Sequence, residues 1–209
     1  KRSLQGRPRK NNLPDKMTYD VIVIGGGASG TCTAIQAKTE DNSILIIDHS
    51  DRIGKKLLST GNGKCNLTNL NCRKNALSQN PDGIYPFNTS GDASFIEMVI
   101  DASDCDDSMT FFESLGMLFL VKDDGVYPRS EQASSVLDVL RFECQRKSID
   151  VVTGYQPLNV TKIGDRFKID DAYECKKLVI STGGRSAPKT GSDGSGYEIA
   201  KAFGHHVVQ

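Results

Sequence analysis

The chain has 209 residues, of which 37% are hydrophobic and 25% are charged, and its formal net charge is zero. This length supports one sizeable core, or one domain and part of another. The charge balance argues against a nucleic-acid partner, and no stretch of sequence has the length of a membrane span or the pattern of a signal peptide, so we expect a cytoplasmic protein.

Residues 1–16 differ from the rest of the chain in charge. They carry six basic side chains and one acidic side chain, which gives this stretch a charge of +5 and leaves −5 for the remainder. They also include two prolines and have no periodic apolar face. This pattern predicts a disordered basic tail or a remnant of cloning, and a folded part that comprises residues 17–209.

A short run of β-branched residues leads into the glycine pattern Gly25-x-Gly27-x-x-Gly30. The pattern predicts a buried parallel strand that turns sharply into a helix. In dinucleotide-binding folds the first glycine makes the turn, the second lets the backbone approach a pyrophosphate, and the third lets the helix pack closely. The N–H groups at the start of the helix, around Ala28 and Ser29, would then face the diphosphate. Glycine-rich turns also serve packing alone, which is the alternative.

A second strand is predicted at residues 43–48, and it ends in Asp48. An acidic residue about 20 positions beyond the glycines accepts hydrogen bonds from the hydroxyls of the adenosine ribose, whereas the alternative is a solvated carboxylate at a strand end. Because an acid here repels a ribose 2′-phosphate, the pattern favours FAD or NAD over NADP. The helix between the two strands is expected to bury Ala28, Cys32 and Ile35.

The middle of the chain contains a long loop, residues 51–91, rich in Gly, Asn, Lys and Ser, which predicts a functional or disordered segment. Apolar spacing then predicts helices at 93–102 and 106–115, and Asp123-Asp124-Gly125 predicts a hairpin turn. Ser130 is expected to cap a helix that runs to about residue 147. The expected buried face of that helix comprises Ala133, Val136, Leu137, Leu140 and Cys144.

Four short strands are predicted at residues 150–153, 159–163, 166–169 and 173–175, and we group them as an antiparallel meander. Residues 177–181 then return as a buried strand that runs into Thr182-Gly183-Gly184. This order of elements resembles the α/β, Rossmann-like FAD-binding fold of the glutathione-reductase type. In that fold the returning strand passes close to the dinucleotide, although a plain turn at the strand end is the alternative for Thr182, Gly183 and Gly184.

Three motifs carry a more specific resemblance. They are Gly54-Lys-Lys-Leu-Leu-Ser-Thr-Gly-Asn-Gly-Lys-Cys-Asn-Leu-Thr-Asn69, Gly125-Val-Tyr-Pro-Arg-Ser130 and the glycine-rich stretch 182–197. In this order they resemble motifs of bacterial NAD(P)/FAD-dependent oxidoreductases of the aminoacetone-oxidase-like group, which includes a bile-acid dehydro-reductase. The resemblance implies a flavoprotein that exchanges hydride through N5 of FAD with NAD(P)H or with a small organic substrate.

The resemblance also implies that the loop at 54–69 wraps the diphosphate and the edge of the flavin. Cofactor contacts are therefore predicted for Lys56, Ser59, Gly61, Gly63, Cys65, Asn66, Thr68 and Asn69, with Lys64 as a further donor. A polar surface loop is the alternative. We expect Cys65 to serve packing rather than redox chemistry, because no second cysteine has the spacing found in flavoprotein disulfide reductases. The six cysteines as a whole indicate reduced structural thiols, without a disulfide framework or a metal site.

Family members run to roughly twice this length, with a β-rich substrate domain inserted after the position of Gly204. The resemblance therefore implies that residues 17–209 are the N-terminal part of an FAD-binding domain, truncated before that insertion. Two other classes stay open: a non-catalytic nucleotide-binding module, and an NAD-linked dehydrogenase with a plain Rossmann domain. The sequence assigns no catalytic acid or base and no oligomeric state, and His205 and His206 are expected at the surface.

Overall fold

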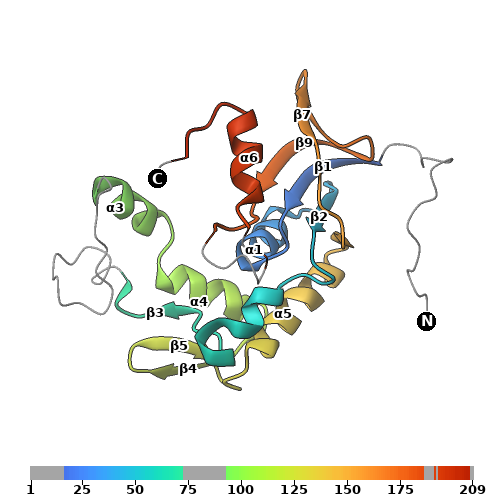
Figure 1. Cartoon of the computed structure of the whole chain (residues 1–209). Coiled ribbons are helices and arrows are strands. Elements are labelled where there is room, and N and C mark those ends of the chain that lie inside the picture. Colours follow the sequence, from blue (N-terminus) through green and yellow to red (C-terminus); the bar gives the residue numbers. More distant parts are fainter. Residues whose placement is uncertain (1–16, 73–92, 186–190, 192, 208–209) are drawn as a thin grey trace. The chain divides into compact units, whose positions relative to one another are not determined.

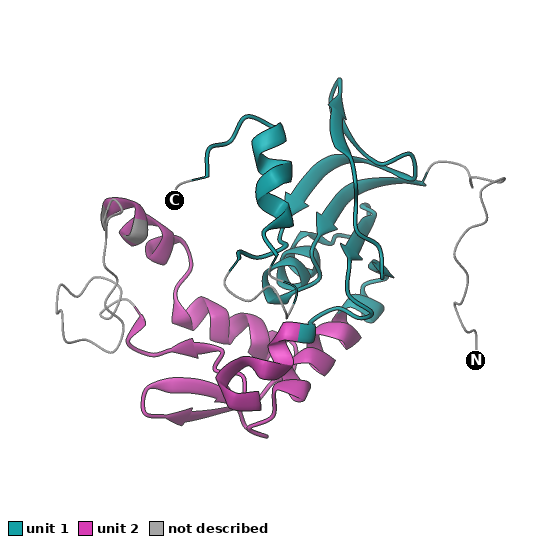
Figure 2. Cartoon of the chain, viewed as in Figure 1, with its two compact units in different colours: residues 1–55, 144–209 teal, residues 56–143 magenta. Residues whose placement is uncertain are grey.

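The computed structural model of the chain describes residues 17–72, 93–185, 191 and 193–207 (Figure 1). They form two compact units, one drawn from residues 1–55 and 144–209 and the other from residues 56–143 (Figure 2). The predicted tail, the later part of the predicted loop and residues 186–190 of the third motif lie outside the described residues. No helix in the described part of the chain is long and apolar enough to cross a membrane.

Unit 1 is built on a six-stranded sheet with the order β6-β2-β1-β9-β8-β7. Its strands are β1 (Met17–Ile24), β2 (Ile44–Asp48), β6 (Asp150–Thr153), β7 (Val160–Ile163), β8 (Arg166–Ile169) and β9 (Tyr173–Ile180). β1 pairs in parallel with both β2 and β9, and β2 pairs in parallel with β6. This arrangement is that of a Rossmann-like fold, so the carboxyl ends of these four strands meet at one edge of the sheet.

Strands β1 and β2 are largely apolar on both faces, as expected for parallel strands that are covered on both sides. On one face Ile22, Ile24 and Ile47 pack with Ile169 and Cys175 of the meander strands. Helix α1 (Ala28–Ala37) contacts β1 and β2 and contributes no residue to that cluster, so it covers the opposite face.

The buried face of α1 consists of Gly30, Thr31, Ala34 and Ile35. The predicted face was therefore right for Ile35 and wrong for Ala28, which is exposed, while Cys32 is half-buried. The face differs from the prediction because Gly30 packs closely against the turn after β1. Residues one helical turn beyond Gly30, such as Ala34, then lie on the same side of α1 and face the sheet.

Two strand predictions were wrong. Residues 150–153 do not belong to the meander, because β6 pairs in parallel with β2 at the edge of the sheet. The predicted strands at 173–175 and 177–181 are one strand, β9, whose first part pairs with both β8 and β1 and whose second part continues along β1. Lys176 and Lys177 are exposed residues inside this strand.

Helix α6 (Ser195–Ala202) is the last helix of unit 1 among the described residues. Ile199 of α6 packs against the same cluster as the meander, and Phe203 meets the Phe167 ring edge-on at a centroid distance of 5.6 Å. Gly204 follows with a φ of +85°, the left-handed conformation expected after a helix end. Figure 1 shows α6 beside β9 and β1.

Unit 2 contains the three-stranded antiparallel sheet β3-β5-β4, made of β3 (Thr68–Asn69), β5 (Gly125–Pro128) and β4 (Phe119–Lys122). The hairpin prediction is confirmed, but its turn residues are Asp123 and Asp124, with φ values of +48° and +62°, and Gly125 opens β5. The prediction of an unstructured loop was wrong for its first part, which holds β3 and the 3-10 segment η1 (Lys55–Gly63).

The helices of unit 2 are α3 (Ala93–Ala102), α4 (Cys105–Ser114) and most of α5 (Ala133–Arg146). The first two confirm the predicted helices within one residue, and Asp104 and Asp107 form a capping box at the start of α4. Helix α5 begins three residues after Ser130, whose hydroxyl accepts the N–H of Gln132. All five residues predicted for its buried face are buried.

Candidate functional site

The turn between β1 and α1 leaves no room for side chains at two of its glycines. Gly25 has a φ of +106°, and a Cβ atom on it would lie 2.4 Å from the carbonyl oxygen of Ser181. A Cβ atom on Gly30 would lie 1.9 Å from the carbonyl oxygen of Gly25. Both glycines are therefore needed by the chain's own packing, as the sequence pattern predicts for the first and third positions.

Asp48 ties this turn to the end of β2. Asp48 is buried, and its two carboxylate oxygens accept the backbone N–H groups of Gly26 and Ser50, each at 2.7 Å. A carboxylate offers about four lone-pair positions. Asp48 can therefore hold the turn and still accept hydrogen bonds from a ribose, as predicted for it.

Gly26 was not singled out from the sequence, although three glycines in a row could have indicated it. A Cβ atom on Gly26 would lie 2.4 Å from Cγ2 of Ile53 and 3.2 Å from Oδ2 of Asp48. The carbonyl of Gly26 also accepts the N–H of Gly54 at 2.7 Å. The segment after β2 thus closes over the turn, which keeps the backbone of Gly26 and Gly27 in one conformation.

Gly27 has no such internal reason to be glycine. Its backbone is extended, with φ −75° and ψ −170°, and among the described residues no atom beyond its chain neighbours lies within 4 Å of where its Cβ would be. It is the N-cap of α1 without a side-chain acceptor, and the first turn of α1, which includes the exposed Ala28 and Ser29, carries no acidic residue. The free N–H groups of a helix start suit an anion, and the open space over Gly27 leaves room for one.

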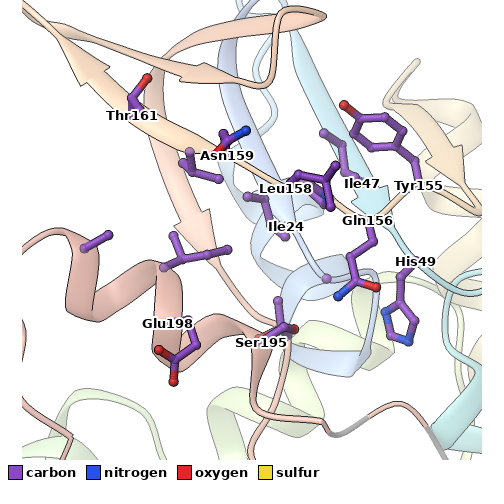
Figure 3. Close-up of a pocket in the computed structure, with 16 residues that line it drawn as sticks. Ile24, Ile47, His49, Tyr155, Gln156, Leu158, Asn159, Thr161, Ser195 and Glu198 are labelled. Carbon is purple, nitrogen blue, oxygen red and sulfur yellow. The ribbon is translucent and has the colours of Figure 1, made fainter.

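A cavity of about 370 Å³ lies beside this turn, at the carboxyl ends of β1, β2 and β9 (Figure 3). This edge is where open α/β sheets bind ligands. Ile24 and Ile47 contribute apolar surface, and the polar lining includes Gln156, Thr182 and His49. Nδ1 of His49 lies 3.8 Å from Oδ1 of Asp48.

Further lining comes from the segment 155–161 and from α6, through Ser195 and Glu198. Sequence reasoning missed His49, Gln156 and Glu198, because no motif joins them and only the fold brings them together. The cavity extends the site from the glycine turn to the residues that follow β2 and β6.

Asp170, in the turn between β8 and β9, holds one wall of the cavity in place. Its carboxylate accepts the N–H of Asn159 at 2.7 Å and the N–H of Leu158 at 3.1 Å, and it also accepts the hydroxyl of Tyr155. Burial and the neighbouring Asp170 raise the pKa of Tyr155 above its usual range, which keeps the hydroxyl protonated and able to donate.

The predicted motif at the end of β9 lies next to the glycine turn, because the N–H of Ser181 donates to the carbonyl of Ile24 at 2.7 Å. A Cβ atom on Gly196 would lie 2.2 Å from Oγ1 of Thr182, and one on Gly184 would lie 3.0 Å from the hydroxyl of Tyr197. Gly183 is exposed, with a φ of +82°. Thr182 and Gly184 therefore pack closely against α6, and Thr182 also lines the cavity.

The residues predicted to contact the cofactor from 56 to 69 belong to unit 2. Gly61, Asn62, Gly63 and Cys65 all have positive φ, and a Cβ atom on Gly61 would lie 2.8 Å from the N atom of Asn66. This tight loop turns its backbone sharply while Ser59, Gly61 and Asn66 stay exposed. Their contact with a dinucleotide stays a prediction.

Several side chains of this loop have partners inside unit 2. Lys64 donates to Glu131 at 2.9 Å, and the hydroxyl of Ser59 donates to the carbonyl of Lys56 at 2.9 Å. Thr68 and Asn69 form β3 and pair with β5. Cys65 is 3% exposed, and burial raises the pKa of its thiol, as expected for a packing residue.

All six cysteines are free thiols. Within the described residues, no group of three or more His, Cys, Asp or Glu side chains is arranged to hold a metal ion.

Residues 19–209 match the family model described as HI0933-like protein Rossmann domain. The chain belongs to this family. A 3-dehydro-bile acid delta(4,6)-reductase of Clostridium scindens is 34% identical over 188 residues, which cover 88% of this chain and 43% of that protein. A ribosomal RNA dihydrouridine synthase of Escherichia coli is 33% identical over 195 residues, which cover 91% of this chain and 46% of that protein. The chain thus spans less than half the length of these HI0933-like relatives.

Solved structures share the fold of this HI0933-like chain at low sequence identity. A flavocytochrome c3 fumarate reductase in its open conformation aligns with a TM-score of 0.57 and 17% identity, over 84% of this chain and 35% of that one. THI4 of Thermovibrio ammonificans aligns with a TM-score of 0.50 and 12% identity, over 90% of this chain and 64% of that one. The chain has the Rossmann-like fold of flavoprotein oxidoreductases, as predicted.

Proposed function

We propose that unit 1 binds FAD, with the diphosphate at the start of α1, and that the protein is an FAD-dependent oxidoreductase. The observation that carries this proposal is Gly27, whose missing side chain leaves open space over an uncapped helix start. When bound, FAD supplies hydride exchange at N5 with NAD(P)H or with a small organic substrate.

The chain's own residues have separate parts in this binding. The backbone N–H groups after Gly27 hold the diphosphate, and Asp48 accepts the ribose hydroxyls through its remaining lone pairs. The cavity beside His49 and Gln156 has apolar walls and polar rims, which suit the adenosine half of the molecule. The loop at 56–69 is proposed to donate hydrogen bonds to the flavin half.

Two substrates are suggested by the curated relatives, a 3-dehydro-bile acid and a uridine of ribosomal RNA. Both names describe the reduction of a carbon–carbon double bond that is conjugated to a carbonyl group. Such a bond can accept a hydride. We propose this substrate class, an unsaturated carbonyl compound, for the whole protein.

Titration with FAD, NAD and NADP, followed by flavin fluorescence and by thermal shift, tests the proposal. We expect FAD to bind more tightly than either nicotinamide cofactor. Gly27→Ala should weaken FAD binding at least tenfold and lower the melting temperature of the cofactor-free protein by no more than about 4 °C. Gln36→Ala, at an exposed position near the other end of α1, is the matched control. Equal FAD affinity in both variants, or tighter binding of NAD than of FAD, contradicts the proposal.

A further inference from the structure

Two cysteines that are far apart in the sequence meet in unit 2. Cys105 is the first residue of α4, and α4 packs against β3. Cys72 follows the end of β3 by three residues and neighbours the thiol of Cys105, whose Sγ also contacts the carbonyl oxygen of Leu70 just before Cys72. The spacing of this pair matches no C-x-x-C motif, so the sequence alone predicts two separate structural thiols.

The two thiols differ in their surroundings. Cys105 is 8% exposed, and its Sγ lies 3.6 Å from Oδ1 of Asp106 and 3.9 Å from the carbonyl oxygen of Leu70. Burial, together with Cys72 and the Asp106 carboxylate, raises the pKa of Cys105 to about 11. Cys72 is only half-buried, so a small solute can reach it. Cys72 is therefore the thiol that reacts first.

We propose that Cys72 and Cys105 are a redox-active dithiol that a peroxide converts to a disulfide, which links the end of β3 to the first turn of α4. The thiolate of Cys72 attacks one peroxide oxygen, the O–O bond breaks, and a sulfenic acid and hydroxide form. Cys105 then loses its proton to solvent and attacks the sulfenic sulfur. The S–S bond forms as the S–O bond breaks and hydroxide leaves.

The reaction balances without any further reagent. Two thiols and one hydrogen peroxide give one disulfide and two water molecules, and two electrons pass from sulfur to the peroxide. The buried, protonated state of Cys105 makes the second step the slower one, because only the thiolate is a nucleophile. A sulfenic acid on Cys72 is therefore expected as a transient species.

The other cysteines provide an internal comparison. Cys65, Cys144 and Cys175 are buried, and burial raises the pKa of Cys32 on α1 to about 11. A low dose of oxidant should accordingly act on Cys72 before it acts on these four thiols.

Peptide mapping of the oxidised protein tests the proposal. The folded protein is treated with a small excess of hydrogen peroxide, its remaining thiols are blocked with N-ethylmaleimide, and its peptides are analysed by mass spectrometry without reduction. We expect one link that dithiothreitol removes, between the peptides that contain Cys72 and Cys105. The proposal fails if these peptides stay unlinked while other cysteines are oxidised, or if other pairs link in equal yield.

Variants separate the roles of the two thiols. Cys105→Ser should abolish the link and leave Cys72 to accumulate as sulfenic and sulfinic acid, whereas Cys72→Ser should leave Cys105 reduced. Cys144→Ser is the matched control and should keep the yield of the link within twofold. If Cys105→Ser does not fold, Cys72→Ser and the wild-type map still decide the question. Oxidation of Cys105 in Cys72→Ser at the wild-type rate overturns the assigned order.

Discussion

The carboxylate of Asp48 accepts the backbone N–H of Gly26 at 2.7 Å across a separation of 22 residues. Its other oxygen accepts the N–H of Ser50 at the same distance. One side chain therefore fixes the turn after β1 and the turn after β2 together. The residue predicted to recognise a ribose is also the residue that shapes the turn proposed to hold the diphosphate.

Asp48→Ala is expected to affect both stability and cofactor binding. It leaves the buried N–H of Gly26 without an acceptor, which costs about 2 kcal/mol in free energy of unfolding. FAD affinity should fall roughly tenfold or more, because the turn and the ribose acceptor are lost together. Urea unfolding and FAD titration measure the two effects. Asp51→Ala, which removes only an exposed contact with Lys55, should change neither, and equal unfolding midpoints for the two variants contradict the expectation.

Gly30→Ala and Gly27→Ala should separate folding from binding. A methyl group on Gly30 meets the Gly25 carbonyl and pushes α1 away from β1, so we expect a loss of about 3 kcal/mol in unfolding free energy. A methyl group on Gly27 meets open space and should cost less than about 1 kcal/mol while weakening FAD binding. Thermal unfolding of the cofactor-free proteins tests the contrast. Similar melting temperatures for Gly30→Ala and Gly27→Ala would contradict this expectation, because they would show that α1 can move away from β1 without loss of stability.

Stability should fall at alkaline pH because of two tyrosines in unit 1. Burial and hydrogen bonds to Asp150 and Asp170 raise the pKa of Tyr19 and Tyr155 above the ordinary value of about 10. Above that pH the unfolded chain releases protons that the folded state retains, so the free energy of unfolding declines as pH rises. Urea midpoints between pH 8 and pH 11 measure the decline. A double variant with phenylalanine at both positions should decline less steeply, and an unchanged slope contradicts this explanation.

Two serine substitutions near α5 should have opposite signs. Ser148 has a φ of +54° two residues beyond the end of α5, so Ser148→Gly should stabilise the protein by about 0.5–1 kcal/mol. Ser134 is exposed inside the same helix, so Ser134→Gly should destabilise it by about 0.5–1 kcal/mol. Chemical denaturation of both variants measures the difference. A destabilised Ser148→Gly protein would mean that the serine side chain matters more than the backbone conformation.

Local sequence patterns were sufficient to predict the glycine turn and its neighbour Asp48. The glycines, the strand before them and Asp48 share one short stretch whose spacing is set by a single βαβ unit, so their arrangement follows from sequence order. The buried face of α5 was also predictable, because helical periodicity alone determines it.

Pairing partners and long-range contacts were not predictable in the same way. Nothing in residues 150–153 indicates that they pair with β2 rather than with the meander, because a short strand carries no information about its neighbour. The continuity of β9 was also missed, although exposed positions inside a strand, such as Lys176 and Lys177, tolerate charge. The parts of Gln156 and Asp170 in the cavity could not be predicted, because only the fold brings their segments together.

Glycines at three positions have no side chain, and atoms of other residues fill the space. These contacts join three motifs from distant parts of the sequence. The carbonyl oxygen of Ser181 occupies the space where a side chain on Gly25 would lie. In the same way, Oγ1 of Thr182 fills the side-chain position of Gly196. The carbonyl oxygen of Gly25 fills the side-chain position of Gly30. A larger residue at any of these glycines requires a compensating shift at its neighbour. We therefore expect these positions to change together during evolution, so that pairwise covariation among homologues should link the glycine turn to α6 through the end of β9.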